Sequence, residues 1–211
     1  MASLKGVITV SCPQDCGEFD AEVWTLIRAD EDPDLKDMVR GGELNLVQCP
    51  VCGKLFYGSV PVVYLDPQAD LSIFVFPQAG EHGEVERKLR EEFALLRDGL
   101  LRELKMHAEP VVFFGAELLK EFLVSEQFLR DESDIIEYAA RELGLETVML
   151  APARARECDW PYRVPAPGGR RTAAAVLPAC DKVLAGYPAL ARLAKFRAAL
   201  EKDPKLDREL A

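Results

Sequence analysis

The chain has 211 residues, of which 49% are apolar, and a formal net charge of −10. This length and apolar content suffice for one or two domains with buried cores. The longest apolar runs, such as residues 111–116, are too short to cross a bilayer, and residues 1–10 contain neither a secretory apolar core nor a cleavage site. We therefore expect a soluble cytoplasmic protein that does not enter a membrane.

The charge is distributed unevenly along the chain. Residues 151–211 hold 12 basic and 7 acidic side chains, whereas residues 1–150 hold 14 basic and 29 acidic ones. Affinity for nucleic acid depends on lysine and arginine side chains that displace counterions from the phosphate backbone. The acidic body therefore disfavours nucleic-acid binding, and only the basic tail offers such contacts. We expect the two parts to complement each other electrostatically.

The first half of the chain has the pattern of a small β-rich domain. Apolar and polar side chains alternate from Glu18 to Arg28, which is typical of a half-covered strand. Asp32 and Pro33 open a short helix that Gly41 and Gly42 end. A turn at residues 66–70 separates two further strands. Together we predict a meander of about five strands, at residues 6–11, 18–28, 44–48, 55–64 and 71–76.

Helices dominate the rest of the predicted structure. Apolar side chains recur at steps of three and four over residues 84–106, which predicts a long amphipathic helix packed on the sheet. Residues 111–114 are a candidate strand, and residues 115–123 a candidate helix. Ser133 is a candidate N-cap for a helix over residues 134–143. Residues 151–171 are rich in Pro, Gly and Arg and predict a long loop, followed by a final helix at about residues 188–201.

Two cysteine pairs carry the clearest chemical signal. The first, Cys12 and Cys16, is separated by three residues, and the second, Cys49 and Cys52, by two. Each pair follows a predicted strand, has Pro directly after its first cysteine, and has Gly directly after its second. Pro fixes one backbone angle of a tight turn, and Gly permits the positive φ that lets backbone N–H groups approach sulfur. The pattern predicts one tetrahedral zinc site per chain, with four cysteine ligands supplied by two knuckles.

Other interpretations of these cysteines remain open. A disulfide suits a secreted protein, which the absence of a signal segment disfavours. A thioredoxin-like redox pair requires its second cysteine to open a helix, but a strand pattern follows Cys52. Iron in a rubredoxin-like cage is chemically possible. Cys158 and Cys180 have no partner at ligand spacing, so we interpret them as ordinary thiols.

The sequence around the knuckles also matches a known family. The matching segments are residues 8–13, 19–24, 42–46, 49–53 and 64–67. On these segments, residues 7–124 resemble the CpXC domain, a prokaryotic family defined by two Cys-Pro-x-Cys motifs. Cys49 and Cys52 fit the motif directly, whereas the first pair has one additional residue between its cysteines. The resemblance implies a zinc-ribbon domain in a family without an assigned activity.

We therefore expect an α+β protein in which an antiparallel, zinc-ribbon-bearing sheet packs against the helix at residues 84–106. Residues 1–124 would form the zinc-binding domain and residues 125–211 a mostly helical region with a Pro/Gly/Arg-rich loop. The function we favour is a non-catalytic protein-binding or regulatory module, with protein partners or self-association. The alternatives are a nucleic-acid-associated factor that uses the basic tail, and an enzyme whose active site carries no recognised motif.

Overall fold

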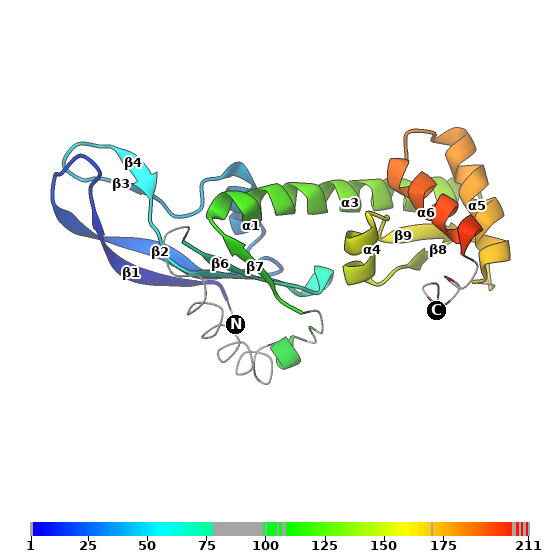
Figure 1. Ribbon diagram of the computed structural model, residues 1–211, viewed down its shortest axis with the longest axis horizontal. Coiled ribbons are helices and arrows are strands. Elements are labelled where there is room, and N and C mark those ends of the chain that lie inside the picture. Colours follow the sequence, from blue (N-terminus) through cyan, green and yellow to red (C-terminus); the bar gives the residue numbers. More distant parts are fainter. Residues whose placement is uncertain are drawn as a thin grey trace. The chain divides into compact units, whose positions relative to one another are not determined.

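The computed structural model in Figure 1 describes residues 2–77, 99, 101–104, 106, 109–169, 171–203, 206, 208 and 210. The chain divides into two compact units, residues 1–123 and 124–211. Each unit has its own hydrophobic core. None of the helices among the described residues is both long and apolar enough to span a membrane.

A five-stranded sheet is the framework of the first unit, in the order β1-β2-β5-β6-β7. The strands are β1 (Leu4–Ser11), β2 (Glu18–Arg28), β5 (Val62–Asp66), β6 (Leu71–Phe76) and β7 (Val111–Phe114). The expected α+β class is confirmed. The sheet is mixed where the sequence predicted an antiparallel one, because β2 pairs with β5, and β6 with β7, in parallel. Both parallel pairs are separated in sequence by long crossovers, as parallel pairing requires.

The crossover from β2 to β5 contains a short helix and a small hairpin. The helix α1 (Pro33–Gly41) begins at a proline and ends at Gly42, whose φ of 76° is left-handed, as the sequence predicted. The hairpin pairs β3 (Leu46–Gln48) with β4 (Leu55–Tyr57). Phe56 of this hairpin meets Phe19 of β2 edge-to-face, with ring centroids 6.1 Å apart. The hairpin therefore packs directly on the β1–β2 ribbon.

The core of the first unit lies on one face of the sheet. Leu35 and Val39 of α1 pack there with alternate side chains of β5 and β6 and with Leu119 and Leu123. On the other face, Leu26 and Leu65 pack with Leu101 and Met106. The helix expected at residues 84–106 lies mostly outside the described residues. The predicted turn at residues 66–70 is present as a 3-10 turn, η1 (Pro67–Ala69), in which the Asp66 carboxylate accepts from the Ala69 N–H.

Helix α3 (Ala116–Glu142) is one continuous helix of 27 residues. The sequence predicted two helices here, with Ser133 as the N-cap of the second, and that prediction was wrong. The Ser133 hydroxyl instead donates to the Leu129 carbonyl four residues earlier, at 2.7 Å, and accepts from the backbone N–H of Tyr162, at 2.8 Å. These two bonds satisfy the hydroxyl inside the helix, where it shares the Leu129 carbonyl with the helical ladder and ties the backbone of Tyr162 to α3.

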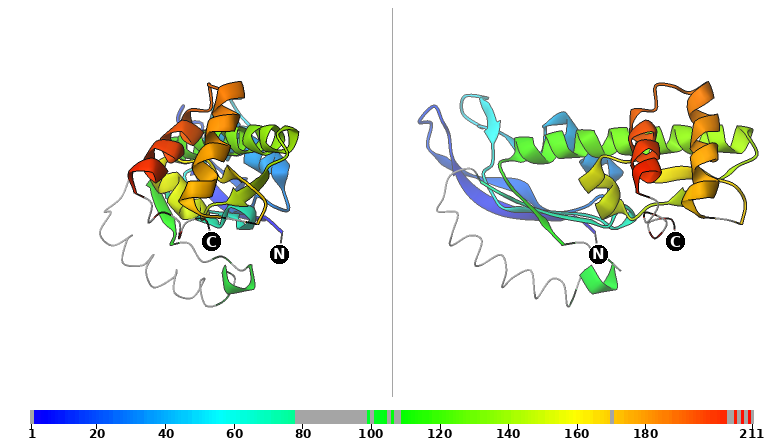
Figure 2. Two further views of the ribbon diagram at one scale, coloured as in Figure 1. Left: turned by 90° about the vertical axis from the view of Figure 1, so that its right-hand side faces the viewer. Right: turned by 45° about the vertical axis from the view of Figure 1, so that its right-hand side comes forward.

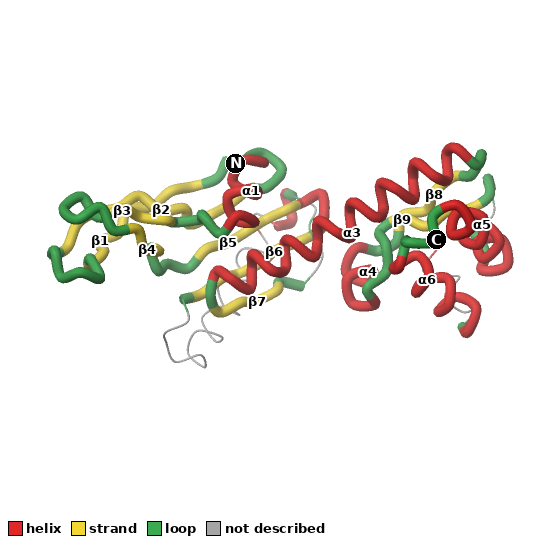
Figure 3. Tube along the Cα trace, turned by 90° about the horizontal axis from the view of Figure 1, so that it is seen from above, coloured by secondary structure: helices red, strands yellow, loops and turns green. Residues whose placement is uncertain are grey.

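The second unit combines helices with a two-stranded antiparallel ladder (Figure 2). Its remaining elements are β8 (Glu146–Met149), α4 (Pro152–Cys158), β9 (Arg163–Ala166), α5 (Ala173–Gly186) and α6 (Ala191–Lys202). Figure 3 shows β8 and β9 together among these helices. The sequence predicted a loop over residues 151–171, which the structure corrects: α4 and β9 lie within that range.

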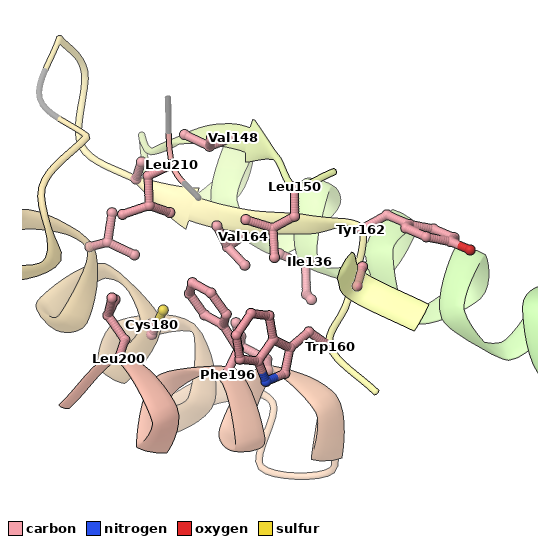
Figure 4. Packing of buried hydrophobic residues seen from close by; sticks show 14 of the residues in the cluster. Ile136, Val148, Leu150, Trp160, Tyr162, Val164, Cys180, Phe196, Leu200 and Leu210 are labelled. Carbon is pink, nitrogen blue, oxygen red and sulfur yellow. The ribbon is translucent and has the colours of Figure 1, made fainter. Parts of the chain in front are cut away.

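The core of the second unit is built around aromatic packing. Trp160 and Phe196 lie against each other in this core (Figure 4). Their rings meet edge-to-face, with centroids 5.3 Å apart. Ile136 of α3 and Val164 of β9 are fully buried in the same cluster. Because α5 and α6 also contribute to this cluster, the ladder is covered by residues far apart in the sequence.

Candidate metal centre

The four predicted cysteines come together at the tips of two hairpins in the first unit. Their Sγ atoms all lie within 4.8 Å of one another, and those of Cys12 and Cys52 are 3.6 Å apart. Tetrahedral sulfur coordination at about 2.3 Å from a metal requires sulfur atoms about 3.8 Å apart. The cluster can therefore hold one metal ion. Cys12 and Cys49 are buried, whereas Cys52 is exposed and Cys16 is partly so.

The two knuckles have loops of the same length despite their different cysteine spacing. Backbone bonds close them, from the Cys12 N–H to Gly17 O at 3.1 Å and from the Cys49 N–H to Lys54 O at 2.9 Å. Each closing pair encloses four residues. Cys52 is the third of the four enclosed residues in the second knuckle, whereas Cys16 is the fourth of the four in the first knuckle. The additional residue therefore moves Cys16 one place along the turn without enlarging the loop.

Left-handed residues make this shift possible. In the first knuckle Asp15 has a φ of 53° and Gly17 a φ of 104°, whereas in the second the residue with positive φ is Gly53, at 70°. Aspartate is one of the few non-glycine residues that tolerates this conformation. Both knuckles thus have a glycine with positive φ directly after the second cysteine, and Asp15 adds a left-handed residue directly before Cys16.

The thiol groups differ in acidity because their surroundings differ. The pKa of Cys49 is lowered to about 7, first because the Cys52 backbone N–H donates to its sulfur, and next through the N–H of Val51. The pKa of Cys16 is raised to about 12 by its hydrogen bonds with the Cys52 and Cys12 thiols. Four thiols this close resist ionising together unless a cation shares their charge, which is the role of a metal.

The remaining cysteines are not part of this cluster. Cys158 lies in α4 and Cys180 in α5, both within the second unit. Burial raises the pKa of the Cys180 thiol to about 12, which makes it unreactive at neutral pH. The structure therefore brings together the two predicted cysteine pairs and leaves these two apart.

Asn45, which no sequence pattern indicated, braces the hairpin that carries Cys49 and Cys52. Its side-chain carbonyl accepts from the Trp24 backbone N–H at 2.7 Å, and its amide donates to the Trp24 carbonyl at 2.9 Å. This pair of bonds ties the start of the β3–β4 hairpin to β2. Asn45 also has a left-handed φ of 57°. A single asparagine between two leucines carries no sequence signal for such a role.

The structure thus defines an α+β protein with a four-cysteine cluster that can bind a metal ion. The family model of the CpXC protein matches residues 10–132, more than half of the chain. The chain therefore belongs to the CpXC family, and the cysteine cluster fits the motifs of that family. The match ends within α3. Neither a curated protein nor a solved structure matches the chain.

Proposed function

We propose that the protein is a non-catalytic protein-binding or regulatory module in which one structural zinc ion, held by Cys12, Cys16, Cys49 and Cys52, organises the domain of residues 1–124. The observation that carries the proposal is the convergence of four thiol sulfurs within 4.8 Å. Sulfur ligands in a tetrahedral set suit zinc, and four of them leave no coordination position for a reactive water. This favours a structural role over a catalytic one.

Zinc would also supply folding energy. The β3–β4 ladder has only three residue pairs, whereas the β1–β2 ladder has eight. Apparent binding free energies for structural zinc are about 10–16 kcal/mol at neutral pH. We infer that the metal fixes the β3–β4 hairpin against the β1–β2 ribbon and so shapes the surface that partners meet.

Charge pairing favours a protein partner over nucleic acid. Within the second unit, six described basic side chains of the tail lie in ion pairs with acidic ones, which lowers the capacity of these six to replace counterions on a phosphate backbone. These ion pairs join Arg154 to Glu157, Arg156 to Glu126, Arg163 to Glu137, Arg192 to Glu132 and Asp159, Lys195 to Asp159, and Arg197 to Asp181 and Glu201.

Metal content tests the zinc assignment. Elemental analysis of the purified chain should give one zinc per molecule, and the double variant Cys49→Ser/Cys52→Ser should lose both the metal and the folded first unit. Cys158→Ser is the matched control, because it removes a thiol from the second unit and should keep the metal. Retention of zinc and of the fold in the double variant would refute the site. Iron in place of zinc in the purified protein would indicate a rubredoxin-like centre.

Partner capture tests the module. Affinity purification of the zinc-loaded chain, followed by mass spectrometry, should recover a protein that the Cys49→Ser/Cys52→Ser variant does not retain. Cys158→Ser should retain it. Recovery of nuclease-sensitive material in place of a protein would favour the nucleic-acid-associated alternative.

A further inference from the structure

The edge of β2 is completed by a side chain where another strand would be expected. The Asn45 side-chain amide accepts from the Trp24 backbone N–H at 2.7 Å and donates to the Trp24 carbonyl at 2.9 Å. These are the two hydrogen bonds that a residue of a neighbouring strand would make. A carboxamide carries the same donor and acceptor as a peptide group. Asn45 thus occupies one position of a strand that no described part of the chain supplies.

The register of the β1–β2 ribbon shows what the rest of this edge offers. The bond from the Cys12 N–H to Gly17 O fixes which residue pairs exchange hydrogen bonds, because such pairs alternate in an antiparallel ladder. Residues 18, 20, 22 and 24 of β2 therefore direct their N–H and C=O groups away from β1. Trp24 meets Asn45 on that side, which agrees with this assignment. β5 pairs only with Leu26, Ile27 and Arg28.

A groove lies beside this edge. Its volume is about 380 Å³, and its walls are residues 19–22 of β2 and residues 46–48 and Pro50 of the hairpin. Hydrogen-bonded pairs alternate in the β3–β4 ladder as well, and the bonds from Cys49 N–H to Lys54 O and from Gly58 N–H to Asn45 O show which pairs these are. The N–H and C=O groups of Gln48 therefore point away from β4. Among the described residues no backbone hydrogen bond joins β2 to β3. Both strands of the groove thus present peptide groups without a neighbouring strand.

The side chains along this edge specify the chemistry of a ligand. Glu18, Asp20 and Glu22 are exposed on one face, whereas Phe19 and Ala21 are half-buried on the other. Asp20 and Glu22 also contact Thr9 and Lys5, but these surface contacts contribute little to stability. An extended peptide that adds to a sheet gains affinity from its backbone and specificity from alternate side chains. Here the alternation is acidic and apolar.

We propose that the edge of β2 at residues 18–22 binds an extended peptide with alternating basic and apolar side chains, as an added strand between β2 and the β3–β4 hairpin. The inference rests on the protein-binding function proposed above and names the class of partner. The hairpin and the β1–β2 ribbon lie at the same end of the first unit (Figure 1), so the zinc site holds both walls of this groove.

Two proline variants test the added strand. Asp20→Pro removes an N–H that faces the groove, whereas Thr9→Pro removes an N–H from the opposite edge of the same ribbon. Thr9 and Asp20 are cross-strand partners whose side chains share one hydrogen bond, so both variants lose that bond equally. Thr9→Pro is therefore a closely matched control for the fold.

The probes are the labelled hexapeptides Lys-Val-Arg-Val-Lys-Val and Glu-Val-Glu-Val-Glu-Val, titrated into the zinc-loaded full chain. The basic peptide should bind, the acidic one at least tenfold more weakly. Thr9→Pro should change the affinity less than threefold, and Asp20→Pro should weaken it at least tenfold. Equal binding to both proline variants, or no binding to the zinc-loaded wild-type chain, overturns the proposal.

Hydrogen exchange in the unmodified chain keeps the proposal testable where a proline variant fails to fold. The amide hydrogens of Asp20 and Glu22 should exchange at least tenfold more slowly with the basic peptide bound, and unchanged exchange also overturns the proposal. Zinc is measured in the same samples. Absence of zinc counts against the proposed module, whereas absence of peptide binding by zinc-loaded protein counts against the added strand alone.

Discussion

Both carboxylate oxygens of Glu126 lie 2.6 Å from the hydroxyl oxygen of Tyr162. Glu126 comes from α3, and Tyr162 directly precedes β9, so the pair ties helix to ladder within the second unit. Both side chains are buried, and the Arg156 guanidinium lies 3.8 Å from the same carboxylate. A buried carboxylate retains its charge only with donors and an opposite charge around it. Tyr162 supplies the closest of these donors.

Removal of this donor should destabilise the second unit. In Tyr162→Phe the Glu126 carboxylate loses a buried hydrogen bond, and the free energy of unfolding should fall by about 1–3 kcal/mol. Urea denaturation measures this change. Tyr138→Phe is the control, because Tyr138 lies on the same unit with its side chain exposed. A loss no larger than in the control would show that Glu126 is satisfied without Tyr162.

Alkaline pH should weaken the same contact. Burial, followed by the negative charge of Glu126, raises the pKa of Tyr162 above its usual value of 10.0. The unfolded chain therefore ionises this phenol at a lower pH than the folded chain does. The resulting stability is fully present below pH 10 and is lost as pH rises beyond that value. The unfolding free energy of the wild-type chain should decrease more between pH 9 and about pH 11 than that of Tyr162→Phe.

Features fixed by local chemistry could be predicted from the sequence. The cysteine knuckles, the helix that begins at Pro33, and the turn at residues 66–70 depend on neighbouring residues with strong backbone preferences. The parallel pairings of the sheet could not be predicted in this way, because they join β2 to β5 and β6 to β7 over long stretches of sequence. The role of Asn45 could not be predicted for the same reason, because it depends on Trp24, 21 residues earlier in the sequence.

Prolines account for the two elements that were missed within residues 151–171, α4 and β9. Pro152 occupies the start of α4, where its missing N–H has no helical partner in any case. Pro165 lies in β9, which belongs to a ladder of only two strands and therefore tolerates a residue without an N–H. An interpretation from neighbouring residues alone treats both as loop residues. The pairing of β9 with β8 and burial in the Trp160 cluster decide otherwise.

Glu132 of α3 provides an N-cap for α6, and its loss should shorten or loosen that helix. Leu190, the residue before α6, supplies no side-chain cap, and the Glu132 carboxylate accepts instead from the N–H groups of Arg192 at 2.8 Å and Leu193 at 3.0 Å. Glu132→Ala should lower the unfolding free energy by about 1–2 kcal/mol, the usual value of a cap. Glu142→Ala, at an exposed position of the same helix, is the control. Equal denaturation midpoints for the two variants would exclude the cap.

The left-handed Asp15 should control how well the first knuckle holds zinc. Its φ of 53° costs a β-branched residue about 1–2 kcal/mol, whereas glycine adopts this conformation readily. Asp15→Gly should therefore keep zinc affinity within about threefold of the wild-type value, and Asp15→Val should weaken it about tenfold, since about 1.4 kcal/mol corresponds to that factor. Competition with a chromogenic chelator measures both constants. Gln14→Val is the matched control, because it places the same side chain one residue earlier, at a position outside the left-handed region. If Gln14→Val and Asp15→Val release zinc equally, the bulk of valine and not the backbone conformation of Asp15 limits the site.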